Sequence, residues 1–168
     1  DGLLIDSKHQ IPRFDFLANT FSDVVFNVDA KTFEAAEVLV NLINTKRIKN
    51  DLCVGSFQQA TIKYMRENIF RDVESAFSMQ EVLSLFFHRI TKKSGDFAGT
   101  CLQIPLKYFG INLITSNLIN YCKKNNIKVH VWTINDEAEM ARLVELGING
   151  IMTDKCRSLL KVLQKQVD

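Results

Sequence analysis

The sequence has no excess of charge of either sign. Its 21 Lys and Arg residues against 19 Asp and Glu residues leave a net charge of +2, which gives no electrostatic reason to expect nucleic acid as a partner. It also lacks any apolar run near the roughly 20 residues that a membrane-spanning helix needs, and no signal peptide is visible at Asp1. These absences argue against nucleic-acid-binding and membrane-spanning proteins.

Paired cysteines are absent as well. Cys53, Cys101, Cys122 and Cys156 are widely spaced and form no CxxC pair, so neither a metal clip nor a disulfide framework is favoured. We therefore expect reduced cysteines in the core and a cytoplasmic or other reducing compartment.

Catalytic signatures of several common enzyme classes are missing too. Nothing in the sequence resembles a Ser-His-Asp arrangement, a Walker loop or a dinucleotide fingerprint. What is present is the composition of a globular protein, with 168 residues, 46% hydrophobic residues and 12 Phe. This length supports one core, and we expect a single domain over residues 1–168.

The stretch 117–160 gives the clearest indication of fold. Its apolar spacing predicts a helix, a strand at 128–134, a helix that Asn135 caps and Gly147 ends, a second strand at 148–153, and a last helix beginning at Asp154 or Ser158. Two short buried strands joined by one helix must lie parallel, because a parallel connection needs a crossover. The stretch is therefore a βαβ unit.

The same alternation continues along the chain. After a polar lead-in at 1–10, helices are expected at 14–21, 33–44, 60–66, 80–90 and 113–124, with a loop at 91–99, and strands begin near 24, 52, 74, 101, 128 and 148. A repeat of roughly 25 residues favours a (β/α)₈ TIM barrel over a doubly wound sheet. Since a barrel needs eight units and only six are counted, we expect an incomplete barrel whose first two units, about 50 to 60 residues, are missing. A start without Met agrees with this expectation.

Barrel enzymes place their chemistry at the carboxyl ends of the strands. On the first strand Asn27, Asp29 and Lys31 share one face at a period of two. Asp29 offers a hard oxygen ligand for a divalent cation and Lys31 a charge for a phosphate. The alternative is an edge strand whose polar face meets water.

The strand at 128–134 carries His130 and Trp132 on the face opposite Val129 and Val131. Trp132 lies nearer the carboxyl end, where its ring either walls a pocket or fills the core. His130 fits a hydrogen-bonded core residue better than a catalyst. His88 fits a solvated helix end, and His9 in the lead-in has no evident partner.

Several segments together resemble a known family. VVFNVDAK, CVGSF, CLQIP, VHVWTIND and LGINGIMTD, in this order, are similar to the carboxyl-terminal two-thirds of the glycerophosphodiester phosphodiesterase family, and IPRFDFLANTF resembles the helix before its third strand. The resemblance extends from Ile11 to Val162. It implies a (β/α)₈ barrel of the phospholipase C-like phosphodiesterase type.

The resemblance also implies an activity. Such proteins hydrolyse glycerophosphodiesters, or in some branches lysophospholipids, to an alcohol and a phosphomonoester, with Mg²⁺ or Ca²⁺ on acidic residues and two histidines as acid and base. Asp29 stands where the family has an acidic metal ligand, Lys31 matches the lysine two residues on, and Trp132 matches the tryptophan of the substrate pocket.

The family's His-Arg-Gly strand, its metal ligands on the first two strands and its second catalytic histidine precede the region of resemblance. No catalytic residue is therefore assigned in this sequence, and we expect this chain alone to be inactive and to bind no ion. Two hypotheses follow. The chain is part of a working metal-dependent phosphodiesterase, or it is an inactive structural or interaction module whose open sheet edges are covered by a protein partner or by self-association.

Overall fold

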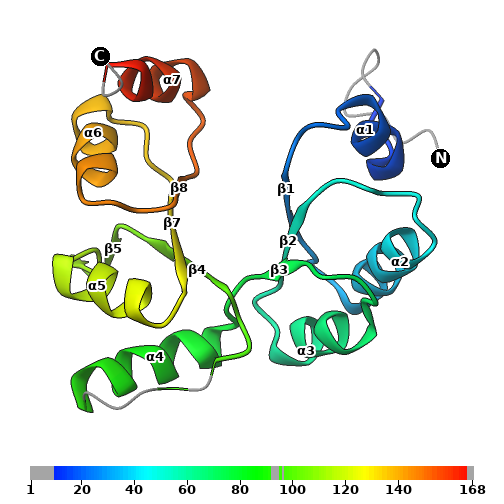
Figure 1. Ribbon diagram of the computed structural model, residues 1–168, viewed down its shortest axis with the longest axis horizontal. Helices are drawn as coiled ribbons and strands as arrows, with labels where there is room; N and C mark the ends of the chain where they lie inside the picture. Colours follow the sequence, from blue (N-terminus) through cyan, green and yellow to red (C-terminus); the bar gives the residue numbers. More distant parts are fainter. Residues whose placement is uncertain (1–9, 92–94, 96, 166–168) are drawn as a thin grey trace. The chain divides into compact units, whose positions relative to one another are not determined.

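A computed structural model describes residues 10–91, 95 and 97–165 of the chain. His9 and most of the expected lead-in lie outside these residues, as does part of the expected loop at 91–99. The chain forms two compact units, Asp1–Glu74 and Ser75–Asp168, which we call unit 1 and unit 2 and describe separately (Figure 1). The expectation of a single domain stays a prediction.

Unit 1 alternates helices and strands on the segments that the sequence predicts. Strands β1 and β2 are parallel, with a register from Phe26 opposite Leu52 to Asp29 opposite Gly55, and the sheet order is β1-β2-β3, with β3 at the boundary between the units. The elements are α1 (Phe14–Thr20), β1 (Phe26–Asp29), α2 (Phe33–Asn44), β2 (Leu52–Gly55), α3 (Gln59–Asn68) and β3 (Glu74–Ser75).

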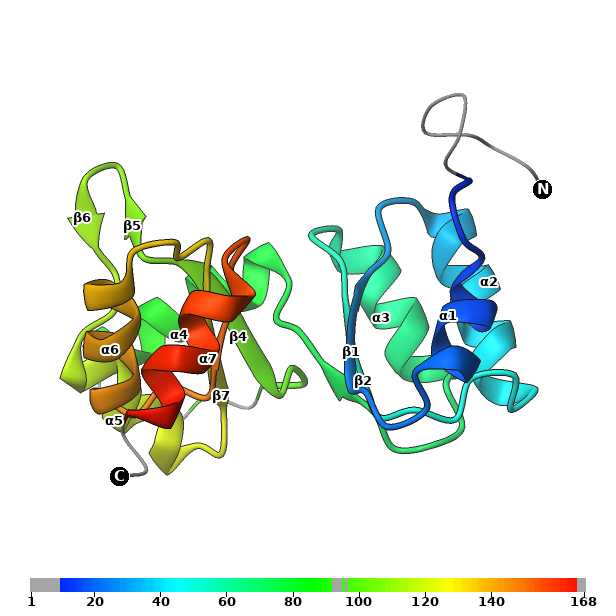
Figure 2. The same cartoon turned by 90° about the horizontal axis from the view of Figure 1, so that it is seen from above.

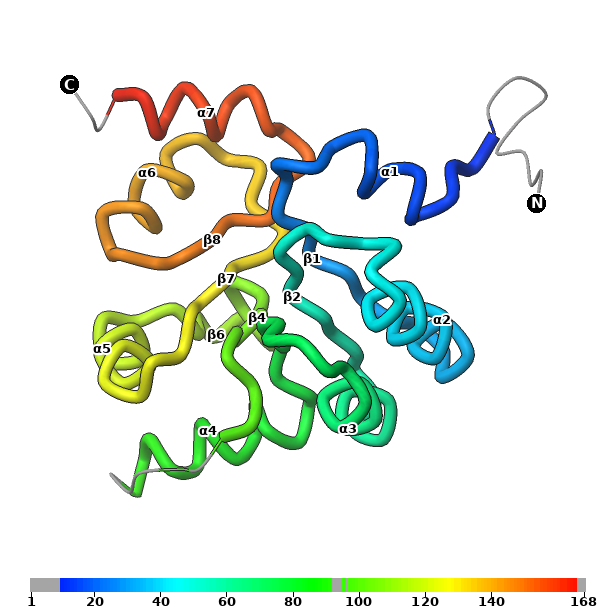
Figure 3. The backbone as a smooth tube through the Cα atoms, turned by 45° about the vertical axis from the view of Figure 1, so that its right-hand side comes forward, coloured from blue at the N-terminus to red at the C-terminus, as the bar shows by residue number. Residues whose placement is uncertain are grey.

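Helices α2 and α3 lie beside the β1–β2 pair and build the core of unit 1 (Figure 3). Helix α2 begins where predicted, because the Thr32 hydroxyl accepts a hydrogen bond of 3.2 Å from the N–H of Ala35. Phe26 and Val28 pack against this core, whereas Asn27 and Asp29 are exposed. The strand therefore has the period of two that the sequence predicts, although Val24 and Val25 precede it rather than belong to it.

Unit 2 contains the predicted βαβ unit. Strand β7 pairs in parallel with β4 on one side and with β8 on the other, and α6 connects β7 to β8. Its elements are α4 (Met79–Thr91), β4 (Cys101–Pro105), β5 (Lys107–Tyr108), β6 (Ile111–Asn112), α5 (Ser116–Lys124), β7 (Lys128–Trp132), α6 (Glu137–Glu145), β8 (Gly150–Ile151) and α7 (Cys156–Gln164).

The antiparallel hairpin β5–β6 is not predicted by the sequence analysis. It occupies the segment before α5, which begins at Ser116 and not at 113. The amide of Leu113 donates to the carbonyl of Leu106, and the Thr115 hydroxyl caps α5 by accepting from Leu118 at 3.2 Å. The hairpin thus ends at Asn112, one residue before the position that was expected to open the helix.

The beginnings of two other helices also differ from prediction. Asp136, and not Asn135, caps α6, accepting from the N–H of Glu139 at 2.8 Å. The Asn135 side chain instead accepts from Thr153 and from the amide of Asp154. These two bonds hold Asp154 in the turn after β8, and α7 begins at Cys156, between the two predicted starts at Asp154 and Ser158.

The cysteines agree with the prediction in part. They form no disulfide within the described residues, and Cys53, Cys101 and Cys122 are buried, but Cys156 is exposed rather than in the core. Among the described residues, no helix is long and apolar enough to cross a bilayer.

Candidate functional site

The carboxyl end of β1 brings Asp29 and Lys31 together. The Lys31 ammonium donates a hydrogen bond to Oδ2 of Asp29 and forms an ion pair with it. About one third of the Asp29 side chain is exposed, so its carboxylate is open to a ligand. Asp29 is the last residue of β1 and Lys31 follows the strand, and their pairing is a feature that the sequence does not predict.

Strand β2 fixes the turn that holds these two residues. The amide of Ala30 donates to the carbonyl of Gly55 at 2.8 Å, and the buried Ser56 hydroxyl donates to the carbonyl of Ala30 at 2.9 Å. Lys31 extends over the ring of Phe57, with Nζ 5.2 Å from its centroid. A carboxylate and an ammonium thus lie side by side on a rigid strand end, an arrangement that can contact a cation and an anion.

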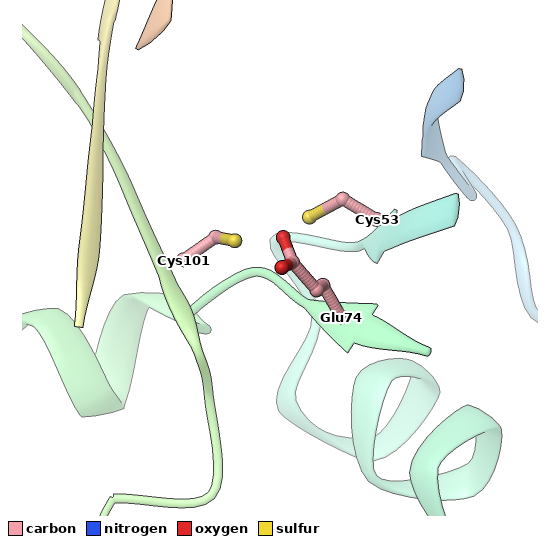
Figure 4. Close-up of side chains that lie close together, drawn as sticks. All are labelled: Cys53, Glu74 and Cys101. Carbon is pink, nitrogen blue, oxygen red and sulfur yellow. The ribbon is translucent and has the colours of Figure 1, made fainter. Parts of the chain in front are cut away.

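Cys53 and Glu74 form a second group in unit 1. Cys53 lies opposite Asn27 in the strand register, and hence on the same face of the sheet as Asn27 and Asp29. Figure 4 shows the Cys53 and Glu74 side chains close together, and their sulfur and carboxylate atoms lie within 4.8 Å of each other. Glu74 is not predicted from the sequence, because its two-residue strand has no clear alternation.

The donor atoms of Asp29, Cys53 and Glu74 do not by themselves fit Mg²⁺ or Ca²⁺. These ions take six or more oxygen ligands, whereas Asp29 offers one carboxylate that is already paired with Lys31. Cys53 adds a thiol next to Glu74, and sulfur is a poor ligand for these cations. A hard cation at the end of β1 would need further oxygen ligands from outside this group.

Trp132 ends strand β7 in unit 2, with Val129 and Val131 buried on the other face. The side chain is half-buried and lies beside Pro105, its register partner on β4. It stands at the carboxyl end of the strand, as the sequence predicts. A partly exposed indole in this position can line a binding surface.

His88 and His130, the two histidines that the structure describes, both contact neighbouring residues of unit 2. Nδ1 of His130 lies 3.5 Å from the amide nitrogen of Gln103, which agrees with the predicted hydrogen bond, and the ring lies against Gly150. The side chain is half-buried rather than part of the core. His88 is half-buried rather than solvated, with Nδ1 2.8 Å from the carbonyl oxygen of Ser84 and its ring against Phe97. Neither lies at a strand's carboxyl end.

A cavity of about 460 Å³ opens at the amino end of β7, the end opposite Trp132. Lys123, Lys128 and Asn149 are among its lining residues. None of the predicted site residues lines it, so this cavity gives no support to the predicted site.

Comparison with known proteins identifies relatives of this chain. The model of the glycerophosphoryl diester phosphodiesterase family matches residues 15–158. "Probable glycerophosphodiester phosphodiesterase 2" from Mycobacterium tuberculosis is 26% identical over 165 residues, which cover 95% of this chain and 62% of that protein. A glycerophosphodiester phosphodiesterase from Caldanaerobacter subterraneus is 35% identical over 57 residues, which are 34% of this chain and 23% of the relative.

Solved structures show the same fold at low sequence identity. An Oleispira antarctica phosphodiesterase in complex with sn-glycerol-3-phosphate has a TM-score of 0.69 and 16% identity, with 92% of this chain and 62% of that one covered. A glycerophosphodiester phosphodiesterase from Thermotoga maritima has a TM-score of 0.58 and 23% identity, covering 88% of this chain and 62% of that one.

These matches support an α/β fold of the TIM-barrel type. The chain spans less than two thirds of the length of the Mycobacterium tuberculosis relative and of both structures. Because the family model covers most of the sequence, the chain belongs to the glycerophosphoryl diester phosphodiesterase family.

Proposed function

We propose that this chain is part of a metal-dependent phosphodiesterase that hydrolyses glycerophosphodiesters or lysophospholipids to an alcohol and a phosphomonoester. The observation that carries the proposal is the family match over residues 15–158 together with the exposed Asp29–Lys31 pair at the carboxyl end of β1. The structure of a related phosphodiesterase holds sn-glycerol-3-phosphate, a phosphomonoester of the expected class.

Asp29 and Lys31 supply opposite charges at this end of the sheet. We assign Asp29 as one oxygen ligand of Mg²⁺ or Ca²⁺, and Lys31 as a cation for the phosphate. The bound ion would polarise the phosphate ester. Because Lys31 pairs with Asp29, its ammonium is held beside the carboxylate and can contact the anionic part of a bound phosphodiester.

Trp132 is assigned to the substrate surface. Its half-buried ring at the end of β7 offers an apolar wall, suited to the glycerol or alcohol part of a phosphodiester. This role requires no proton transfer from Trp132.

The acid and base of the reaction are assigned to residues beyond the region of family match. By the family resemblance they belong to two βα units that precede the helix corresponding to α1.

In unit 1, α1 and the residues before β1 expose Phe16, Phe21 and Val25, and β1 is an edge strand. In unit 2, β8 is an edge strand and α7 exposes Leu160. Exposed apolar side chains in a unit whose sheet ends in an edge strand form surfaces that further βα units can cover.

The second candidate function is an inactive structural or interaction module. The same exposed apolar side chains and edge strands favour it, since a partner chain can cover them as well as a further part of the same chain can. The two functions differ in the origin of the covering segment and in whether hydrolysis occurs.

Release of phosphomonoester from glycerophosphocholine, with and without added Mg²⁺ or Ca²⁺, tests the proposal. The chain alone is expected to be inactive. The native protein, of which we propose this chain is a part, is expected to hydrolyse the diester and to lose this activity when a chelator removes the metal ion. The coding sequence of that protein should encode His-Arg-Gly-like and Glu-x-Asp-like strands upstream of Asp1.

An intact reading frame without such strands, or an inactive native protein, contradicts the enzymatic proposal. Light scattering then tests the interaction module, for which association with a partner or a second copy is expected. A stable monomer that binds no partner argues against that module.

A further inference from the structure

Hairpin β5–β6 of unit 2 presents three large apolar side chains to solvent. Tyr108, Phe109 and Ile111 are 59%, 88% and 68% exposed. Tyr108 and Ile111 lie opposite each other in the register, so their side chains share a face, and the Tyr108 ring meets that of Phe109 at 4.6 Å between centroids. The hairpin stands out from the sheet of its unit (Figure 2).

The turn of this hairpin holds Phe109 in an unfavourable backbone conformation. Phe109 has a φ of 47° and Gly110 a φ of 78°, both in the left-handed region. Two-residue turns of this kind favour Asn-Gly, because a bulky residue at positive φ is strained. Phe109 therefore does not stabilise the turn. Its exposed ring is instead available for a contact outside the hairpin.

Charged residues are sparse in the sequence on both sides of the tip. Lys107 is the one charged residue in the sequence from Phe97 to Cys122, and it pairs with Asn112 at the base of the hairpin. An apolar tip with a lysine behind it suits the surface of a phospholipid bilayer, where the rings enter the acyl boundary and the ammonium meets lipid phosphates.

The size of the patch favours lipid over a protein partner. Three such side chains offer on the order of 400 Å² of contact area, whereas a stable protein interface buries about 800 Å² on each partner. A bilayer surface needs only a few inserted side chains for reversible binding.

We propose that the hairpin tip, Tyr108 to Ile111, inserts into the surface of a phospholipid bilayer. The hairpin follows β4 at Pro105, the register partner of Trp132. Insertion therefore brings the Trp132 end of this sheet to the lipid. This inference goes beyond the proposed function, because lipid binding requires no hydrolysis.

Flotation of the chain with phosphatidylcholine vesicles that contain about one part in five of phosphatidylglycerol tests the proposal. Phe109→Asn is expected to weaken binding about tenfold, and the fold is retained or stabilised because Asn suits the positive φ. The matched control is Phe70→Asn, since Phe70 is 86% exposed in unit 1, and binding should not change. Lys107→Gln is expected to weaken binding about fivefold.

A native chain that does not float with the vesicles overturns the proposal, and so does equal loss of binding in the Phe109 and Phe70 variants. If Lys107→Gln has no effect, the charge argument for lipid fails. If Phe109→Asn instead changes the molar mass in light scattering, the tip contacts protein. Each of these readouts is independent of phosphodiesterase activity.

Discussion

Asp15 on α1 is held by two arginines. Its carboxylate accepts hydrogen bonds from Arg13 at 3.1 and 2.9 Å and from Arg47, and Oδ1 also accepts from the amide of Phe16 at 3.1 Å. The hydrogen bond from Arg13 is the largest cause that holds the pKa of Asp15 below its usual 3.8. Charge from both arginines acts in the same direction, and burial opposes it.

A lowered pKa makes the contribution of Asp15 depend on pH. The ionised carboxylate stabilises the fold above pH 3.8, and this stabilisation is lost as the pH falls through the lower pKa of the folded state. Asp15→Asn should therefore lower the urea midpoint at pH 6 and have little effect near pH 2. The control Asp72→Asn, at an exposed residue, should change it little at either pH. An effect of Asp15→Asn that grows as the pH falls would contradict this assignment.

Cys122 and Cys156 differ in reactivity for physical reasons. Burial raises the pKa of Cys122 to about 12, so at pH 8 about one molecule in ten thousand carries the reactive thiolate. Cys156 is exposed. In the native chain, maleimide should modify Cys156 at least about a hundredfold faster than Cys122, and Cys156→Ser should remove the fast phase. Peptide mapping by mass spectrometry checks this, and rapid labelling of Cys122 would disprove it.

At the scale of helices and strands, the sequence predicted those features that depend on interactions between neighbouring residues. Helix α2 has the predicted bounds because Thr32 caps it and its apolar side chains recur at helical spacing. The hairpin β5–β6 was missed because its strands have two residues each and its turn carries Phe109 in place of the Asn that signals such turns. Gly110, which lies between apolar residues, was the one feature of the sequence that could have indicated this turn.

The candidate site shows the same limit. The period of two in β1 predicted that Asp29 shares a face with Asn27, and both are exposed in the structure; this alternation depends on neighbouring residues alone. The proximity of Cys53 to Glu74 depends on pairing between strands distant in sequence, which no local pattern encodes.

The β7–β8 pairing depends on the absence of a side chain at Gly150. A Cβ at this position would lie 2.9 Å from Cδ2 of His130, its register partner. Gly150→Ala should therefore displace the ring and lower the free energy of unfolding by about 1–3 kcal/mol in urea denaturation. His130→Ser should remove most of this cost in the double variant. Equal costs in both backgrounds would show that the ring is not the obstacle.

At the scale of the whole molecule, six strands of the described residues occupy the segments predicted for six βα units, and the hairpin is added between β4 and α5. The chain matches 62% of the length of its Mycobacterium tuberculosis relative. The proposal that two further units complete the barrel and carry the acid and base explains both the exposed apolar edges and the absence of catalytic histidines from the predicted site.

The most direct test of the central claim is the rate of glycerophosphocholine hydrolysis by the native protein with Asp29→Asn. Loss of the carboxylate should reduce kcat/KM at least about a hundredfold, because a neutral amide is a weaker ligand for a divalent cation. Asp23→Asn, at an exposed residue before β1, should leave the rate unchanged. Native activity in the Asp29 variant would show that this strand end does not carry the chemistry.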